Sequence, residues 1–164
     1  MIIVLQLVLY CLLFFLLVKC AARDNGLNCL YFYSDEYQQE AKKRGFADDL
    51  DAVKKKGKRF MIPFCIVMLI ALILIIAVWN HVTDFKTAYI QTVIFLVVMN
   101  WFDGIMIDRI WVGYSKIWRI KGMEGVPYVK SWKTIFTRRG LGTLLYLIIA
   151  LAVAGIIMLV GNLI

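Results

Sequence analysis

TAYIQTVIFLVVMNWFDGIM, residues 87–106, is the stretch that decides the fold. An α-helix needs about 20 mostly apolar residues to cross the hydrocarbon core of a bilayer. This stretch has that length, but Asn100 and Asp103 lie near its end and Asp108 follows closely. A carboxylate inside a span is costly and usually has a partner or a function. The stretch therefore predicts a membrane helix that carries polar chemistry at one end.

Three further blocks of sequence carry no charged residue: 1–18, 60–82 and 140–164. Hydrophobic residues make up 62% of the 164-residue chain, whereas soluble domains contain about 45–50% apolar residues. Since lipid cannot hydrogen-bond the backbone, these blocks should be helices. We predict an all-α integral membrane protein, one membrane domain over residues 1–164, whose transmembrane helices span about residues 2–18, 60–80, 87–107 and 140–162.

Positive charge concentrates in the two longer polar segments, residues 19–59 and 108–139. Ten of the 19 Lys and Arg residues lie in the first segment and eight in the second, while Lys86 lies in the hairpin between spans two and three. Cytoplasmic loops carry an excess of Lys and Arg. This positive-inside pattern predicts that both segments are cytoplasmic and that the hairpin and both termini lie outside. The predicted location is multi-pass in the plasma (cytoplasmic) membrane.

The net charge of +8 indicates contact with the bilayer. Basic residues beside spans commonly hold anionic lipid headgroups, so we expect lipid and no nucleic acid as a partner. Gln6 is the strongest polar interruption of span one. We expect its side chain to reach the headgroups, and the alternative is a hydrogen bond to a neighbouring helix.

Short helices are predicted in the two cytoplasmic segments. Residues 34–44 begin with Ser34 and two acidic residues and end with basic residues before Gly45, the order that favours a capped helix. Residues 48–56 repeat the acidic-to-basic order and lead toward span two, with a break expected near Gly57. Residues 128–139 form a basic amphipathic pattern typical of a helix lying in the headgroup plane. Its expected membrane-interface anchors are Tyr128, Trp132 and Phe136.

The polar end of span three gives the candidate site. If the helix of span three continues past the membrane, successive side chains are rotated by about 100° around its axis. Asn100, Asp103 and Asp108 would then lie within one arc of about 140°. The candidate residues are these three and possible countercharges, namely Asn100, Asp103, Asp108, Arg109, Arg138 and Arg139. One reading is a cytoplasm-facing site for a proton, a cation or a lipid headgroup. The other is that Asp103 lies at the membrane boundary and pairs with a basic residue of a loop.

Motifs of common enzyme classes are missing from the sequence. It has no G-x-S-x-G, no P-loop and no H-E-x-x-H. The four cysteines form no C-x-x-C pair, and the single histidine, His81, lies in the outer hairpin. We therefore expect no metal site and no cofactor, and the sequence leaves open whether the protein is an enzyme.

Two functions remain open, with a third less favoured. The first is a small non-catalytic partner subunit or regulator that acts at the cytoplasmic membrane face, because most polar residues lie there. Its partner would be a membrane or cytoplasmic protein, or a second copy of the chain in a homo-oligomer. The alternative is a membrane-embedded enzyme or binding site for a lipid or amphiphilic ligand that uses Asn100, Asp103 and Asp108. A transporter protomer is less favoured, because spans one, two and four offer little polar lining.

Overall fold

The computed structural model describes residues 2–23 and 25–163, which form helices and connecting loops without a strand. Four helical segments of this part are long and apolar enough to cross a membrane: α1 (Ile2–Ala22), Leu50–Trp79, Phe85–Tyr114 and Trp132–Leu163. The second comprises α3 (Leu50–Ile73) and the π-helix η2 (Leu74–Trp79), and the fourth contains α6 (Trp132–Gly161). The third comprises α4 (Phe85–Phe102), the π-helix η3 (Asp103–Trp111) and α5 (Val112–Tyr114). The predicted all-helical fold with four possible spans is confirmed.

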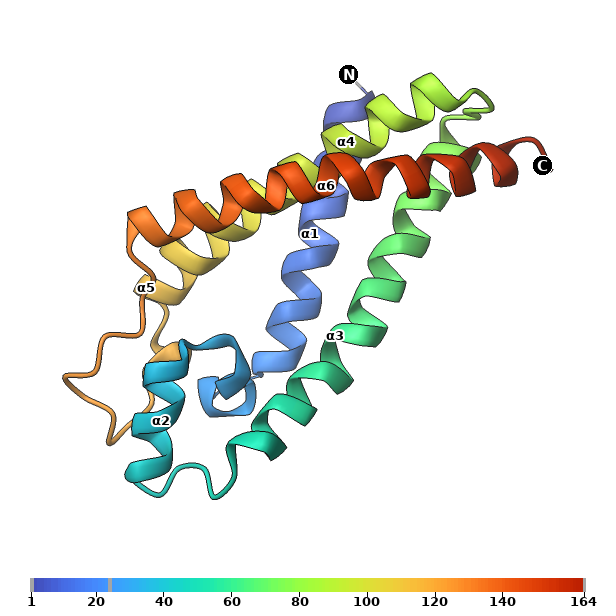
Figure 1. Cartoon of the computed structure of the whole chain (residues 1–164). Helices are drawn as coiled ribbons and strands as arrows, with labels where there is room; N and C mark the ends of the chain where they lie inside the picture. Colours follow the sequence, from blue (N-terminus) through green and yellow to red (C-terminus); the bar gives the residue numbers. More distant parts are fainter. Residues whose placement is uncertain (1, 24, 164) are drawn as a thin grey trace.

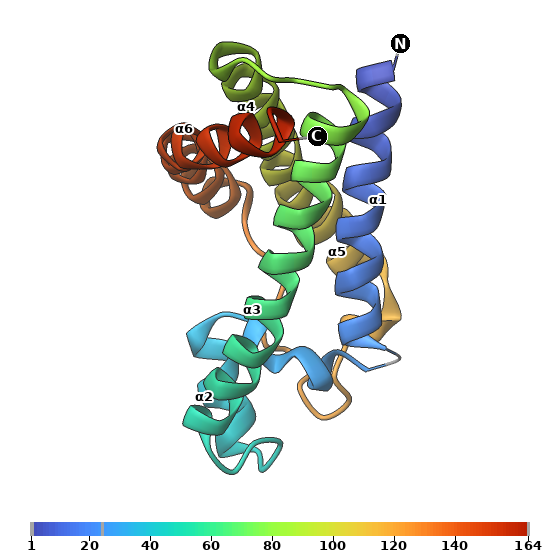
Figure 2. The same ribbon diagram turned by 90° about the vertical axis from the view of Figure 1, so that its right-hand side faces the viewer.

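The helices α4 and α6 form an antiparallel pair, and α1 and α3 cross this pair at a steep angle (Figures 1 and 2). Small residues of α6 allow the close approach, since a methyl group on Gly142 would lie 3.1 Å from Oδ1 of Asn100. The buried core runs between the four helices and includes Tyr10, Leu72 and Phe95. The Phe95 and Tyr10 rings pack edge to face, with ring centroids 5.5 Å apart.

One end of the bundle, here called the hairpin end, joins three helices through amide side chains. Gln6 of α1 is fully buried and donates to Oδ1 of Asn80 at 2.6 Å, and Asn80 donates to Gln91 of α4 at 2.8 Å. Asn162 donates to the carbonyl of Thr83 at 2.9 Å. The start of α1, the hairpin and the end of α6 therefore lie at one end of the molecule. We expected the Gln6 side chain to reach the lipid headgroups, and this expectation was wrong. The side chain instead forms the alternative hydrogen bond, to Asn80 at the end of a neighbouring helix.

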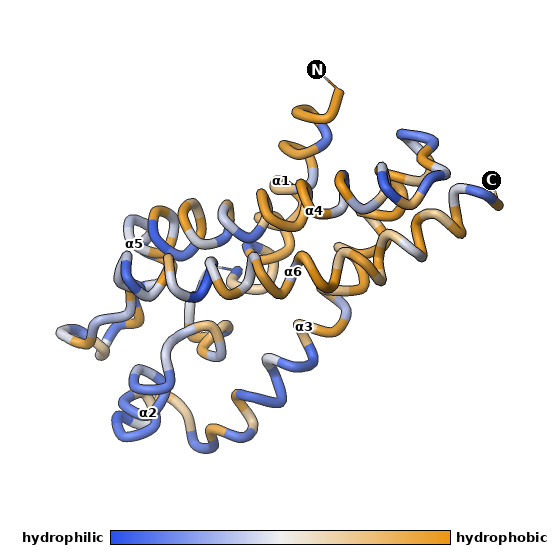
Figure 3. The backbone as a smooth tube through the Cα atoms, turned by 45° about the horizontal axis from the view of Figure 1, so that its top comes forward, coloured by the Kyte–Doolittle hydropathy of each residue, from blue (hydrophilic) through white to orange (hydrophobic). Residues whose placement is uncertain are grey.

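The opposite end, here called the cap end, is a small folded layer. It consists of the 3-10 helix η1 (Gly26–Phe32), the helix α2 (Asp35–Lys43) and the 3-10 helix η4 (Lys116–Trp118). The hydroxyl of Tyr33 donates to the carbonyl of Trp118 at 2.8 Å, which joins the two polar segments of the chain. Figure 3 shows hydrophilic backbone concentrated in this layer, in the first turns of α3 and in the hairpin.

The capping signals of α2 predicted its ends well. The Ser34 hydroxyl accepts a hydrogen bond from the Tyr37 backbone N–H at 3.3 Å, as an N-cap does. Arg44 is the C-cap, and Gly45 follows in the left-handed region at φ +78°. These local hydrogen bonds explain why the helix could be predicted from short-range sequence alone.

Two expectations about the other short helices were wrong. No break occurs at Gly57. The helix α3 begins at Leu50, where Asp49 is the N-cap, and runs through the glycine, which packs against the Tyr31 ring. The amphipathic pattern over residues 128–139 does not form a separate helix. Ser131 caps α6, which then continues as one helix into the fourth span, while residues 127–131 are not helical. Continuing a helix adds a backbone hydrogen bond at each step, whereas starting a new one is costly.

Candidate functional site

A π-helix brings the two acidic residues of span three together. Asp103 and Asp108 are five residues apart, so on an α-helix they would point about 140° away from each other. The segment η3 begins at Asp103 and is built from wider i→i+5 turns, such as the bond from the Val112 N–H to the Ile107 carbonyl. Both carboxylates consequently face α6. The sequence predicted that these residues share one face of a continuous α-helix. In the structure π-helical turns bring the two carboxylates to one side, and the helix ends at Tyr114.

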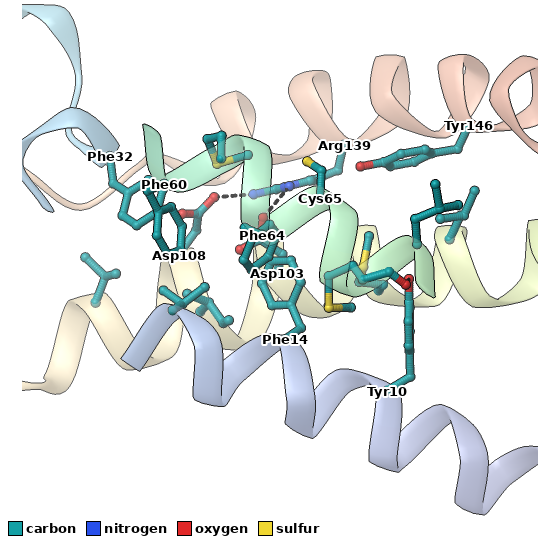
Figure 4. Close-up of a pocket in the computed structure, with 18 of the residues that line it drawn as sticks. Tyr10, Phe14, Phe32, Phe60, Phe64, Cys65, Asp103, Asp108, Arg139 and Tyr146 are labelled. Carbon is teal, nitrogen blue, oxygen red and sulfur yellow. Dashed lines mark hydrogen bonds and ion pairs between the residues drawn. The ribbon is translucent and has the colours of Figure 1, made fainter. Parts of the chain in front are cut away.

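Arg139 of α6 binds both carboxylates (Figure 4). Its Nη1 lies 2.7 Å from Oδ2 of Asp103, and its Nη2 lies 2.5 Å from Oδ2 of Asp108. Lys130, in the loop before α6, lies with Nζ 2.8 Å from the other oxygen of Asp108. These four residues are called the ion cluster below. Their side chains are 14–24% exposed, so the charges are largely removed from solvent.

Asn100 fixes the backbone beneath the ion cluster. Its Nδ2 donates to the carbonyl of Arg139 at 2.8 Å and to the hydroxyl of Thr143 at 3.2 Å. Its Oδ1 accepts a hydrogen bond from Nη1 of Arg139 at 3.4 Å. The indole N–H of Trp101 donates to the same Thr143 hydroxyl at 3.2 Å. One turn of α6 is thereby held against the end of α4, with the guanidinium aimed at η3.

A cavity of about 580 Å³ leads away from the ion cluster between all four long helices. Apolar side chains line most of its length, from Phe14 and Phe64 near the cluster to Leu72 and Val153 at the far end. Figure 4 shows Asp103, Asp108 and Arg139 toward one end and Tyr10 toward the other. A volume of this size falls within the range of about 300–1,000 Å³ that is usual for small-molecule sites.

Aromatic rings of the cap end line the charged end of the cavity. Tyr33, Trp118 and Tyr128 all contribute, and the Tyr33 centroid lies 5.9 Å from that of Trp118 and 6.4 Å from that of Tyr128. Tyr37 stacks on Tyr33 at 4.6 Å. Burial raises the pKa of Tyr33 well above its ordinary value and that of Tyr37 to about 12. Both phenols therefore stay neutral at physiological pH.

The sequence-predicted site residues separate into two groups. Asn100, Asp103, Asp108 and Arg139 come together as described. Arg109 lies at the edge, where it donates to the carbonyl of Lys130 at 3.2 Å and its guanidinium lies 5.2 Å from the Trp132 ring centroid. Arg138 is exposed.

The three predicted interface anchors have different surroundings. Trp132 and Phe136 are exposed on the first turns of α6, with ring centroids 6.0 Å apart. Tyr128 precedes α6 and packs in the cap end beside Tyr33 and Tyr37, with its centroid 6.3 Å from that of Tyr37. Tyr128 thus lines the cavity and does not share a helical face with the other two.

Lys130, Thr143 and Tyr146 belong to the site but were not predicted from the sequence. A signal for two of them exists, because Arg139, Thr143 and Tyr146 continue the spacing of the buried stripe Ala150, Val153 and Ile157 on α6. Polar residues at i, i+4 and i+7 of a helix share one face. Lys130 lies in the loop before α6, where the loop conformation places its side chain, and no comparable sequence pattern predicts that position.

The ion cluster has limited means of holding a metal ion. Both carboxylates are already paired with Arg139. Among residues 2–23 and 25–163, no group of three or more His, Cys, Asp or Glu side chains is arranged to hold one. The four cysteines are free thiols.

Comparisons of the chain with protein-family models, curated proteins and solved structures found no match.

Proposed function

We propose that this protein is a multi-pass membrane protein that binds one lipid-like amphiphile in the cavity between its four long helices. The polar head of the ligand lies at the ion cluster, and its apolar chain extends toward Leu72 and Val153. The observation that carries the proposal is a cavity of about 580 Å³ that is apolar along its length and ends in four charged side chains. Ligand sites commonly combine apolar walls with a few polar groups that fix orientation.

The exposed lining residues indicate how a ligand enters. Met61, Cys65 and Leu69 of α3 and Ile149 of α6 line the cavity and are exposed, whereas all lining residues of α1 are buried. We infer that the cavity is reached between α3 and α6. An opening between two membrane-spanning helices would admit an amphiphile from the bilayer without passage of its apolar chain through water.

The charge distribution supports an orientation of the molecule in the membrane. Five basic residues of α3 next to the cap end are exposed: Lys54, Lys55, Lys56, Lys58 and Arg59. An excess of positive charge favours the cytoplasmic side. In the proposed orientation the cap end and the ion cluster face the cytoplasm, and the hairpin end faces outward. The role of partner subunit that the sequence suggested stays a prediction beside this proposal.

Native mass spectrometry of the protein extracted gently from its host tests the proposed function. We expect a bound amphiphile mass on the wild-type protein. Val153→Trp fills the far end of the cavity and should remove this mass, whereas Leu151→Trp, on the exposed face of the same helix, should retain it. Unchanged helicity of both variants serves as the folding control. A wild-type protein without a bound amphiphile, or equal retention by both variants, contradicts the proposal.

A further inference from the structure

We infer that the ligand of this cavity carries an electroneutral, zwitterionic headgroup of the phosphocholine or phosphoethanolamine type. The inference rests on the proposed function and deepens it by naming the ligand class. Two observations carry it: the balance of charge in the ion cluster and the aromatic rings beside it.

The ion cluster contains two carboxylates and two cations, so its formal charges sum to zero. Arg139 contacts Asp103 and Asp108, and Lys130 contacts Asp108. A buried charge is costly unless an opposite charge compensates it. A headgroup with a net charge would leave one uncompensated charge in this largely desolvated site. A zwitterion adds one charge of each sign and keeps the site neutral.

Each half of a zwitterionic headgroup finds a matching partner. The guanidinium of Arg139 and the ammonium of Lys130 line the cavity and can donate to phosphate oxygens. Asp103 also lines the cavity and makes its ion pair with Arg139 through Oδ2. Its second oxygen provides an acceptor for an ammonium group.

The aromatic rings favour the cationic half of the headgroup. Tyr33, Trp118 and Tyr128 come from three separate segments and line the same cavity as the ion cluster, and Tyr128 lies two residues before Lys130 in the chain. Aromatic faces attract quaternary and primary ammonium groups, and several rings around one cation form the usual recognition site for choline. Aromatic rings give no comparable gain to an anionic headgroup. The site therefore combines recognition of an ammonium with recognition of a phosphate.

A panel of single-chain lipids with one common acyl chain tests the inference. The panel contains lysophosphatidylcholine, lysophosphatidylethanolamine, anionic lysophosphatidylglycerol, uncharged monoacylglycerol and a cationic alkyltrimethylammonium of matched length. Each is titrated into the full chain in a maltoside detergent, and the bound fraction is measured by native mass spectrometry. We expect the two zwitterionic lipids to bind at least about tenfold more tightly than the others, a difference of about 1.4 kcal/mol.

Charge variants of the ion cluster sharpen this test. Asp103→Asn leaves the cluster with one excess positive charge and should shift the preference toward lysophosphatidylglycerol. Lys130→Gln leaves one excess negative charge and should shift it toward the alkyltrimethylammonium. Arg138→Gln changes an exposed residue beside the cluster and should leave the preference unchanged. Because the two variants are expected to change the preference in opposite directions, a general loss of folding cannot imitate the result.

The outcomes separate the two proposals. Binding of no panel member overturns both the cavity ligand and its headgroup class. Equal binding of monoacylglycerol, or tighter binding of lysophosphatidylglycerol or of the alkyltrimethylammonium by the wild-type protein, overturns the zwitterionic headgroup and leaves the amphiphile site in place. The same preference in Asp103→Asn and Lys130→Gln overturns the role of the ion cluster in headgroup selection.

Discussion

The side chain of Arg139 lies directly across Gly104, where an added methyl group would come within 2.8 Å of Cγ and 2.9 Å of Nε. Gly104 is buried in η3, directly after Asp103 and one turn before Asp108, the two carboxylates that Arg139 binds. The absence of a side chain at residue 104 is therefore what lets the guanidinium reach both. Several properties of the ion cluster depend on this contact.

Gly104→Ala should lower stability, because Arg139 is held by two ion pairs and cannot move away without losing one of them. Overpacking of this kind typically costs about 1–3 kcal/mol. Gly140→Ala is the control on α6, since nothing lies within 4 Å of an added methyl group there, and a helical Gly→Ala change gains up to about 1 kcal/mol. Thermal unfolding in detergent measures both. Similar shifts in Tm for the two variants would show that Gly104 is not needed for the contact.

Arg139→Gln should destabilise the protein far more than Arg138→Gln. Removing one partner of a buried ion pair costs about 3–5 kcal/mol, because the remaining charges are left uncompensated. Arg138 is exposed, and exposed substitutions usually change stability by less than about 0.5 kcal/mol. Chemical unfolding in mixed micelles compares the two neighbours. Equal unfolding free energies would mean that the ion cluster contributes nothing to stability.

Gln6→Leu should loosen the hairpin end. The change removes the paired hydrogen bonds between Gln6 and Asn80 and leaves the bond from Asn80 to Gln91. Polar contacts between membrane helices average about 0.6 kcal/mol, with a maximum near 1.7 kcal/mol. Hydrogen exchange of the 80–84 hairpin should rise in Gln6→Leu, with Leu5→Ala on the exposed face as the control. Unchanged exchange would rule out a role for the pair in closing this end.

A bound ligand should protect Cys65 from alkylation and leave Cys20 reactive. Both thiols are exposed, but only Cys65 lines the cavity. The buried thiols Cys11 and Cys29 should react slowly in either state. Peptide mass spectrometry after timed exposure to N-ethylmaleimide, with and without lysophosphatidylcholine, gives the four rates. If Cys65 and Cys20 keep the same ratio of rates, the ligand does not occupy the cavity beside α3.

Labelling of single cysteines tests the proposed orientation. Lys86→Cys at the hairpin end and Lys121→Cys at the cap end are placed in a chain whose four native cysteines are replaced, and both positions are exposed. A membrane-impermeant maleimide should label Lys86→Cys in intact cells and Lys121→Cys only after permeabilisation. The two polar segments that meet at the cap end, residues 19–59 and 108–139, carry 18 of the 19 Lys and Arg residues, and such an excess favours the cytoplasmic side. The reverse pattern would invert the orientation.

Predictions from the sequence succeeded where the controlling forces are local. The ends of α2 follow from hydrogen bonds of Ser34 and from the left-handed Gly45, all within a few residues. The break predicted near Gly57 does not occur: α3 runs through this residue, and the Tyr31 ring packs on it. The separate helix over residues 128–139 failed for a related reason, since Ser131 and α6 make one continuous helix.

The candidate site shows the same division. Asn100, Asp103 and Asp108 could be selected from the sequence because polar residues at the end of a span are rare and costly. Their partner among three arginines could not be chosen, since Arg109 is adjacent to Asp108 in sequence and Arg138 and Arg139 are neighbours at the start of span four. The π-helical turns of η3 and the packing of Gly142 on Asn100 select Arg139.

The sequence by itself determined an all-helical fold with four helices long and apolar enough to cross a membrane, because long apolar blocks leave their backbone no favourable state in lipid except a helix. It also determined where charge and polar chemistry gather along the chain. Only the tertiary structure decided that the two carboxylates share one guanidinium, that Lys130 joins them from a loop, and that an apolar cavity begins there. The physical reason is that ion pairs and cavities depend on distances between segments as far apart in sequence as Tyr10 and Val153, and hydrophobic patterning does not encode those distances.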